Sequence, residues 1–400
     1  MAESIGGTGE GRGGRPRAVI AGAGIAGQAA ALALHAAGWD PLVVERAPGR
    51  RSSGYMVNLS GAGIRAADRL GILPALRSAD LGAFGSAMVR ADGRVRFAIP
   101  AGVAASAVGD MVTVFRGDLE GALYEQLQDR AEVRFGTTVR RVEPDGDRVR
   151  AVLGDGTAVD AGLVVGADGL HSQLRAEVAG SVEEPVVDMG HMVAAVPLDP
   201  PPPGVPENES RSFIGAGRSA SVVNLGPGRS SAFFAYRCPD TAAELRRGPA
   251  EALAAAYGDL GGAVPGVLDQ VGAGSGPVYF DSAAQVVLDR WSAGRTVLLG
   301  DAAWCVTVFA GHGAALALEG AQRLGEALSD PRADPAPALA EWESGLRPGA
   351  ARRQALARTG MAQFAPPTAF HAWAGSVAAR AMLAPGIRGL VQRSIARSRA

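Results

Sequence analysis

The stretch RAVIAGAGIAGQAAALALHAAGWDPLVVE, residues 17–45, decides the fold. An apolar run ends at Gly22, Gly24 and Gly27, spaced as GxGxxG, and a helix-forming segment and a second apolar run follow. Strand, glycine turn, helix and strand form a βαβ unit, the start of a parallel sheet. The glycines permit a tight turn, close approach of a pyrophosphate and close helix–strand packing. Glu45 ends the second strand, where a carboxylate can bind both hydroxyls of an adenosine ribose. The unit predicts dinucleotide binding and does not separate NAD from FAD.

The composition excludes several classes of function. The chain has 400 residues and a net charge of −1, which argues against nucleic-acid binding. All 39 basic residues are arginine, so Schiff-base, pyridoxal phosphate and P-loop lysine chemistry is excluded. The two cysteines, Cys238 and Cys305, suit a reducing compartment and offer no zinc spacing, so we expect no metal site. No apolar run approaches the roughly 18 residues of a membrane span, and residues 1–16 lack a signal-peptide pattern. We therefore expect a cytoplasmic protein without a stable membrane span.

The chain leaves the parallel sheet twice and returns to it. Residues 84–100 alternate around Ala91-Asp92-Gly93, which predicts a hairpin, and residues 212–238 resemble antiparallel strands joined by glycine turns. RTVLLGDAA, from Arg295, resumes the buried-strand pattern, and the remainder is helical. We predict an α/β fold: a Rossmann-type nucleotide-binding domain with an inserted, mostly antiparallel β domain and C-terminal helices. The predicted boundaries are a disordered tail at 1–16, the nucleotide domain at 17–80, 113–180 and 291–350, the β domain at 81–112 and 181–290, and C-terminal helices at 351–400.

The last helical stretch, residues 368–400, ends rich in arginine. We interpret it as a helix packed on the body of the protein with a solvated cationic end. Docking on a membrane or on a partner is the alternative.

Two further motifs identify the cofactor. Asp168-Gly169, with Ser172 and Arg175, follows an apolar run, and Gly300-Asp301 ends another. Together with GxGxxG, and in this order, they resemble the flavoprotein monooxygenases of the para-hydroxybenzoate hydroxylase fold. That group includes the tetracycline-inactivating hydroxylases and many polyketide-tailoring oxygenases. The resemblance covers nearly the whole chain from about residue 17, and it implies that the nucleotide domain binds FAD and the β domain binds substrate.

The resemblance also implies roles for individual residues. Glu45 would bind the adenosine ribose, and Asp168 would shape the turn shared by the pyrophosphate and the incoming nicotinamide. Asp301 would bind the ribityl hydroxyls. The turn at residues 311–314 would bring backbone N–H groups and a helix N-terminus to the isoalloxazine, where they stabilise the reduced ring. The predicted cofactor-binding residues are Gly22, Gly24, Ala26, Gly27, Glu45, Arg46, Arg51, Arg116, Asp168, Asp301, Gly311, His312, Gly313 and Ala314.

The implied reaction is oxygen insertion. In the family scheme NAD(P)H binds transiently and reduces FAD, O2 adds at the C4a carbon, and the resulting hydroperoxide hydroxylates or epoxidises the substrate. We therefore expect a small apolar substrate, of polyketide or aromatic secondary-metabolite type, and a monomer or homodimer. The predicted substrate wall is Met56, Phe234, Tyr236 and Phe309, and ordinary core packing is the alternative for each. We assign no catalytic side chain, because the cofactor carries the chemistry.

Two positions depart from the family pattern. Trp304 stands where His or Tyr commonly follows GDAA, and Val308 replaces a proline before the second glycine turn. Proline stiffens the loop beside the flavin, whereas valine leaves its backbone freer. The alternative function is therefore a flavin-bound enzyme of the same fold that catalyses a cyclisation or rearrangement with little or no net redox change.

Overall fold

The computed structural model describes residues 14–50, 55–102, 110–180 and 185–382. Its first sheet has six strands in the order β17-β18-β11-β1-β2-β7. All neighbours are parallel except the antiparallel pair β17–β18, so the carboxyl ends of the parallel strands meet at one edge. The strands in this order are Ser292–Ala293, Thr296–Leu298, Leu163–Gly166, Arg17–Ala21, Asp40–Glu45 and Glu132–Phe135.

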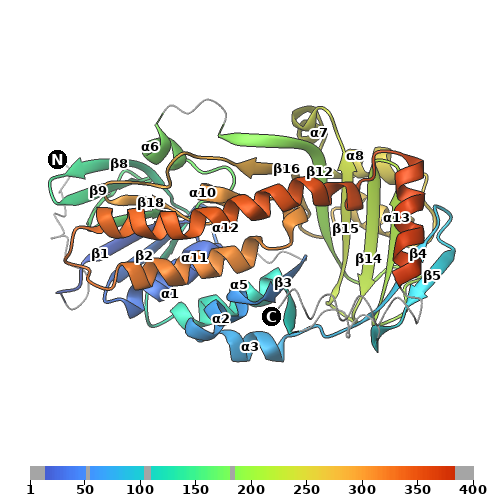
Figure 1. Cartoon of the computed structure of the whole chain (residues 1–400), viewed down its shortest axis with the longest axis horizontal. Coiled ribbons are helices and arrows are strands. Elements are labelled where there is room, and N and C mark those ends of the chain that lie inside the picture. The colour runs from blue at the N-terminus through green and yellow to red at the C-terminus, as the bar shows by residue number, and fades with distance from the viewer. Residues whose placement is uncertain (1–13, 51–54, 103–109, 181–184, 383–400) are drawn as a thin grey trace.

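Helices and a small sheet cover this parallel sheet, which explains why β1, β2 and β11 are apolar almost throughout. The alanine-rich helix α1 packs closely on α11, and α5 and α2 lie beside them (Figure 1). These helices are α1 Ile25–Ala36, α2 Ala62–Arg69, α3 Leu73–Ser78, α5 Arg116–Leu127, α6 Arg175–Ala179, α10 Asp301–Trp304 and α11 Gly313–Ala327. The small antiparallel sheet consists of β8 Val139–Asp145, β9 Arg148–Leu153 and β10 Ala158–Ala161.

The second large sheet has seven strands in the order β16-β12-β15-β14-β13-β4-β5. Only β13 and β4 run parallel, and the others pair antiparallel. The hairpin predicted around residues 84–100 is confirmed by the β4–β5 pairing. The strands in sheet order are Tyr279–Val286, Val186–Leu198, Ser230–Arg237, Arg218–Asn224, Glu209–Gly215, Gly85–Val89 and Val95–Ile99.

Each face of this second sheet meets a different neighbour, and Phe309 and Met361 pack on the face that is turned away from α8 and α9. On one face the strands pack against α8 and α9, forming a separate core around Phe234 and Tyr257. The ribbon formed by β3, Met56–Ser60, and β6, Met111–Phe115, connects the two large sheets in the chain. The covering helices are α7 Thr241–Arg247, α8 Pro249–Tyr257 and α9 Val264–Gly272.

Two C-terminal helices end the described part of the chain. Helix α12, Pro335–Phe364, runs the length of the molecule from the parallel sheet to the seven-stranded sheet, and α13, Ala369–Met382, lies at the far end (Figure 1). Among the described residues, no helix has both the length and the apolar character needed to cross a bilayer. The α/β class, the second antiparallel sheet and the C-terminal helices confirm the predicted architecture. The predicted tail lies outside the described residues up to residue 13.

Candidate cofactor and active site

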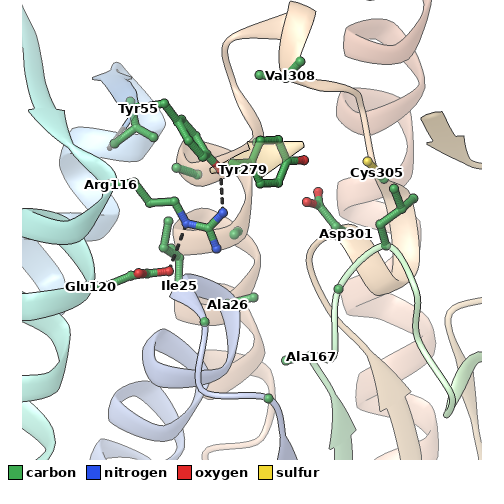
Figure 2. Close-up of a pocket in the computed structure, with 18 of the residues that line it drawn as sticks. Ile25, Ala26, Tyr55, Arg116, Glu120, Ala167, Tyr279, Asp301, Cys305 and Val308 are labelled. Carbon is green, nitrogen blue, oxygen red and sulfur yellow. Dashed lines mark hydrogen bonds and ion pairs between the residues drawn. The ribbon is translucent and has the colours of Figure 1, made fainter. Parts of the chain in front are cut away.

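A cleft of about 510 Å³ lies where the carboxyl ends of the parallel strands approach the seven-stranded sheet. One part of its wall consists of the β1–α1 turn, the end of β2, the start of α5 and the segments after β11 and β18. Strands β12 and β16 form the other part, and Tyr279 of β16 is seen among the lining side chains (Figure 2). We call these parts the cofactor end and the sheet end. Chain segments far apart in sequence therefore line one cavity, as the three motifs predicted.

The glycine turn is built by close backbone contacts. Gly22 has φ 104°, and a Cβ there would lie 2.4 Å from the Ala167 carbonyl oxygen. A Cβ at Gly27 would lie 1.8 Å from the Gly22 carbonyl oxygen, so Gly27 supports the turn from behind without lining the cleft. Gly24 and Ala26 line the cleft directly. The turn therefore leaves room for a ligand at the N-terminus of α1, where free N–H groups favour anions.

The carboxylate of Glu45 is fixed by the same turn. It accepts hydrogen bonds from the Ala23 N–H at 2.9 Å and from the Ala47 N–H at 2.8 Å. Gln28, which is 4% exposed, donates from Nε2 to the Ala23 carbonyl at 2.7 Å and so holds this peptide from the other side. Arg46 is exposed and also lines the cleft. The strand end thus presents an oriented carboxylate beside the glycine turn.

Arg116 starts α5 and reaches across the cleft toward the glycine turn (Figure 2). Its Nη2 lies 3.9 Å from where a Cβ of Gly24 would stand. Nε donates to the Glu120 carboxylate at 2.9 Å, and Nη1 donates to the Tyr55 hydroxyl. Burial disfavours its charge, but Tyr55 and Glu120 outweigh burial and raise the pKa of Arg116. The result is a permanent, oriented cation inside the cleft.

Asp168 lies on the loop after β11. Its Oδ2 accepts from the Gln173 N–H at 2.8 Å and from the Leu174 N–H at 3.3 Å. Arg175, which is buried, donates to the Leu170 carbonyl at 2.8 Å and to the Ala302 carbonyl at 3.0 Å. The arginine of this motif therefore ties the loop that carries Asp168 to the segment that carries Asp301.

Asp301 begins α10, and its carboxylate points into the cleft opposite Arg116 and Tyr279 (Figure 2). The side chain is exposed to the cleft while protein surrounds it, and this desolvation raises the pKa of its carboxyl. Cys305 lies beside it, and burial holds the pKa of that thiol well above its usual range. Its Sγ donates to the Ala284 carbonyl at 3.3 Å, so the thiol is a packed donor rather than a nucleophile.

The segment after Cys305 carries backbone strain. Thr307 is β-branched and adopts φ 71° and ψ 156°, a region that costs about 1–3 kcal/mol for a non-glycine residue. Its Oγ1 accepts from the Phe309 N–H at 3.1 Å and so caps the 3₁₀ helix η2, Val308–Ala310. The strained residue therefore sets the position of Val308, which lines the cleft.

The second glycine turn follows η2. Gly311, Gly313 and Ala314 line the cleft at the N-terminus of α11. His312 does not line it, because the side chain is exposed and its Nδ1 contacts the Ala310 carbonyl. The structure thus brings the backbone of this turn to the cleft and leaves the imidazole outside.

Trp304 differs from Val308 in its surroundings. It is 2% exposed and packs against Trp291 and Trp342, with ring centroids 4.5 and 5.8 Å away. It does not line the cleft. Of the two departures from the family pattern, only Val308 stands at the site.

The predicted substrate wall is wrong at two positions. Phe234 and Tyr236 lie on the face of β15 that turns away from the cleft, where Phe234 stacks on Tyr257 and Tyr236 donates to Glu244 at 2.9 Å. Their neighbours Phe233 and Ala235 lie on the opposite face, in a cluster with Val193, which lines the cleft. Side chains alternate along a strand, so an error of one residue selects the opposite face.

Of the other two predicted wall residues, only one lines the cleft. Met56 lines the cleft, whereas Phe309 packs behind it, with ring centroids 5.9 Å from His191 and 5.2 Å from Phe364. Arg51 lies outside the described residues, and the preceding Arg50 lines the cleft with its guanidinium 4.6 Å from the Tyr124 ring. The lining residues that the motifs did not predict include Gln28, Arg50, Tyr55, Glu120, Tyr279 and Cys305. Apart from Arg50, which neighbours a predicted arginine, none has a sequence signal of its own.

Two buried polar atoms test whether the cleft fits FAD. Gln28 Oε1 and Asp168 Oδ1 are buried at the cofactor end and have no hydrogen-bond partner within the described structure. Unpaired buried acceptors are costly, and hydroxyl donors of a bound ligand can satisfy them. With the glycine cradle, the Glu45 carboxylate and the Arg116 cation, these atoms fit a dinucleotide with ribose and ribityl hydroxyls. The fold and the site define a dinucleotide-binding α/β protein.

Comparison with known proteins identifies the family. Residues 16–338 match the family model described as FAD binding domain, and the chain belongs to this family of FAD-dependent monooxygenases. It is 31% identical over 339 residues to a 3-amino-4-hydroxybenzoate 2-monooxygenase of Streptomyces cremeus, covering 82% of each chain. It is 29% identical to the FAD-dependent monooxygenase asL4 of Sarocladium schorii, covering 83% of this chain and 84% of the relative. The fold matches tetracycline destructase Tet(55) with a TM-score of 0.78 at 22% identity, covering 95% and 96% of the two chains. The protein is thus an oxidoreductase with FAD as its cofactor.

Proposed function

We propose that the protein inserts oxygen into a neutral, apolar substrate of polyketide or aromatic secondary-metabolite type, with NAD(P)H as the transient reductant and O2 as the oxidant. The distribution of charge along the cleft carries this proposal. The charged lining residues that the structure describes, all at the cofactor end, are Glu45, Arg46, Arg50, Arg116, Glu120, Asp168 and Asp301. The lining residues from β12 and β16 are Val193, Tyr279, Ser282, Ala283 and Ala284. None of these five side chains is charged, so a charged substrate group held against the two strands would find no counter-ion on them, which is costly.

The chain's own residues bind, orient and exclude water. The glycine turn would hold the pyrophosphate, Glu45 the adenosine ribose and Asp301 the ribityl chain. When bound, FAD supplies the redox chemistry, accepting electrons from NAD(P)H and activating O2. The backbone N–H groups at the N-terminus of α11 are placed to stabilise negative charge on the reduced ring. Val193 and Ala283 contribute buried apolar surface at the sheet end of the cleft.

Substrate-stimulated oxidation of NAD(P)H tests the proposal. The FAD-loaded protein would be assayed for NAD(P)H oxidation and oxygen uptake with neutral polycyclic phenols, and with matched compounds that carry a carboxylate. We expect stimulation by the neutral members and little by the acids. Equal stimulation by the carboxylates would contradict the proposed substrate class, whereas a flavin that NAD(P)H does not reduce would contradict the reaction.

A cyclisation or rearrangement without net redox change is the second candidate function. The observation that favours it is Val308, which follows the strained Thr307 and lines the cleft where the family carries proline. In that case product would form from substrate while the flavin stayed oxidised, and product and substrate would have equal mass.

We also propose a cytoplasmic location and a monomeric or homodimeric state. Both cysteines, Cys238 and Cys305, are free and buried, which suits a reducing compartment. Light scattering on the purified protein measures its mass in solution, and a larger assembly would contradict the proposed state.

A further inference from the structure

Helix α13 is oriented with its large side chains outward. Phe370, Trp373 and Val377 are 68%, 54% and 45% exposed. Their spacing of three and four residues places them on one face of the helix. The half-buried positions of the same helix are small, among them Ala372, Ser376 and Ala379. The protein therefore packs the small face of α13 inward and leaves the aromatic face without a described partner.

This exposed face stands out within the molecule, and we call Phe370, Trp373 and Val377 the aromatic stripe. The other four tryptophans, Trp39, Trp291, Trp304 and Trp342, are at most 3% exposed. The Phe370 and Trp373 rings lie 5.9 Å apart and form one apolar surface. The helix is held in place at its start, because the Pro366 carbonyl accepts from the Gly217 N–H of the β13–β14 turn at 2.6 Å.

Positive charge accompanies the stripe. After Glu343 the sequence contains nine arginines and no Asp or Glu through residue 400, in a chain whose net charge is −1. Arg347, Arg353 and Arg358 contact the body of the protein. Arg380 is exposed one turn after Val377, and four more arginines follow within residues 383–400. In the sequence, the aromatic helix is thus followed by a segment that carries arginines and no acidic residue.

We propose that the aromatic stripe of α13 docks the protein peripherally on an anionic lipid surface. Aromatic side chains enter the boundary between headgroups and acyl chains, and nearby arginines are attracted to anionic headgroups. The charge favours this occupant, because the nine arginines without an acid after Glu343 complement anionic headgroups, whereas a second copy of the same region would offer no opposite charge.

The neighbouring surface has the same character. Figure 1 places α13 at the same end of the molecule as the edge strands β4 and β5. There Val95 is 51% exposed, and Arg94 and Arg96 flank it with exposed side chains. Adjacent side chains alternate across a strand, so Val95 and Arg96 lie on opposite sides of this edge, which thus adds both apolar and cationic groups at this end of the molecule. This proposal does not rest on the reaction that the protein catalyses.

Vesicle binding by the full-length, FAD-loaded protein tests the docking surface. Co-sedimentation would compare phosphatidylcholine vesicles with vesicles that contain phosphatidylglycerol, at low and high salt. We expect binding to the anionic vesicles that weakens with salt, together with a blue shift of Trp373 emission. Phe370→Ser with Trp373→Ser should lower that binding about tenfold or more. Leu356→Ser is the matched control, because Leu356 is 61% exposed on α12 but lies outside the stripe.

Other results of the vesicle experiment would contradict lipid docking. No binding to anionic vesicles, equal binding to neutral ones, or equal binding by the double variant would overturn the proposal. A dimer in sedimentation equilibrium that the double variant abolishes would assign the stripe to a second copy instead. Retained FAD content and an unchanged Tm in the double variant show that the loss of binding is not unfolding.

Discussion

The two ends of the cleft are lined by different kinds of chemical group. At the cofactor end, backbone groups and charged side chains are fixed by short contacts, such as the Glu45 carboxylate between the Ala23 and Ala47 N–H groups. At the sheet end, small and apolar side chains such as Val193 and Ala283 present a surface without described charge. The first arrangement tolerates few substitutions, because each residue satisfies a geometric demand. The second can change with the substrate while the fold persists.

The glycine turn gives the sharpest test of the cofactor end. Gly27→Ala forces a Cβ against the Gly22 carbonyl oxygen, and we expect a loss of stability on the order of 3 kcal/mol or more, with little FAD retained. Gly24→Ala is the matched control, because its Cβ would meet only Arg116 Nη2 at 3.9 Å. That variant should keep its Tm without cofactor and lose roughly tenfold or more in FAD affinity. Equal Tm values for both variants would contradict the account of the turn.

The sheet end is tested by two adjacent phenylalanines. Phe234 is fully buried against Tyr257 on the helix side, so Phe234→Ala should cost about 3–5 kcal/mol and leave the substrate preference unchanged. Phe233 lies on the cleft side and is half-buried, so Phe233→Ala should cost less, on the order of 1–2 kcal/mol, and change the KM for substrate. Urea denaturation and steady-state kinetics measure both effects, and a reversed pattern would restore Phe234 to the substrate wall.

Substitution of Asp301 tests its predicted role in FAD binding. We expect Asp301→Ala to be colourless or weakly flavinated, with FAD affinity reduced about 10- to 100-fold, as for hydrogen bonds to a charged group. Full FAD occupancy of the purified variant, measured by its absorbance at 450 nm, would remove Asp301 from the cofactor site.

The raised pKa of Asp301 also predicts a pH dependence in the cofactor-free protein. A carboxyl whose folded pKa is raised binds more protons folded than unfolded, so its contribution to stability falls as pH rises above the ordinary pKa of Asp. Asp301→Asn removes the titrating carboxyl and with it this pH-dependent contribution to stability. We expect its Tm without FAD to exceed that of the unsubstituted protein at neutral pH and to approach it at acid pH. The opposite ordering at neutral pH would contradict the direction of the pKa shift.

The smallest expected effect is at Val308. It is the first residue of a 3₁₀ helix, where the backbone N–H has no acceptor within the helix and proline is tolerated. Val308→Pro should therefore stabilise the protein slightly, by about 0.5–1 kcal/mol, with FAD affinity unchanged. If loop stiffness controls oxygen transfer, the ratio of product formed to NAD(P)H consumed will rise. An unchanged ratio would show that the valine is neutral for the reaction.

The same contrast explains what could be predicted from sequence. Gly22 and Glu45 were predicted from the βαβ unit and its GxGxxG spacing, and Asp168 and Asp301 were predicted from the resemblance of their motifs to the flavoprotein monooxygenases. Tyr55 and Tyr279 were not, because they meet only after the chain has folded, with ring centroids 5.5 Å apart. The strand face of β15 was misassigned because Phe233 and Phe234 are equally apolar, and only packing on α8 decides which one turns inward.

The origin of the oxygen atom in the product tests the central claim most directly. The FAD-loaded protein would be supplied with NAD(P)H, ¹⁸O2 and a neutral substrate that stimulates NAD(P)H oxidation, and the product mass would be measured. The account predicts one ¹⁸O atom per product molecule and one NAD(P)H consumed per oxygen atom inserted. Product of unchanged mass, formed while the flavin stays oxidised, would contradict it.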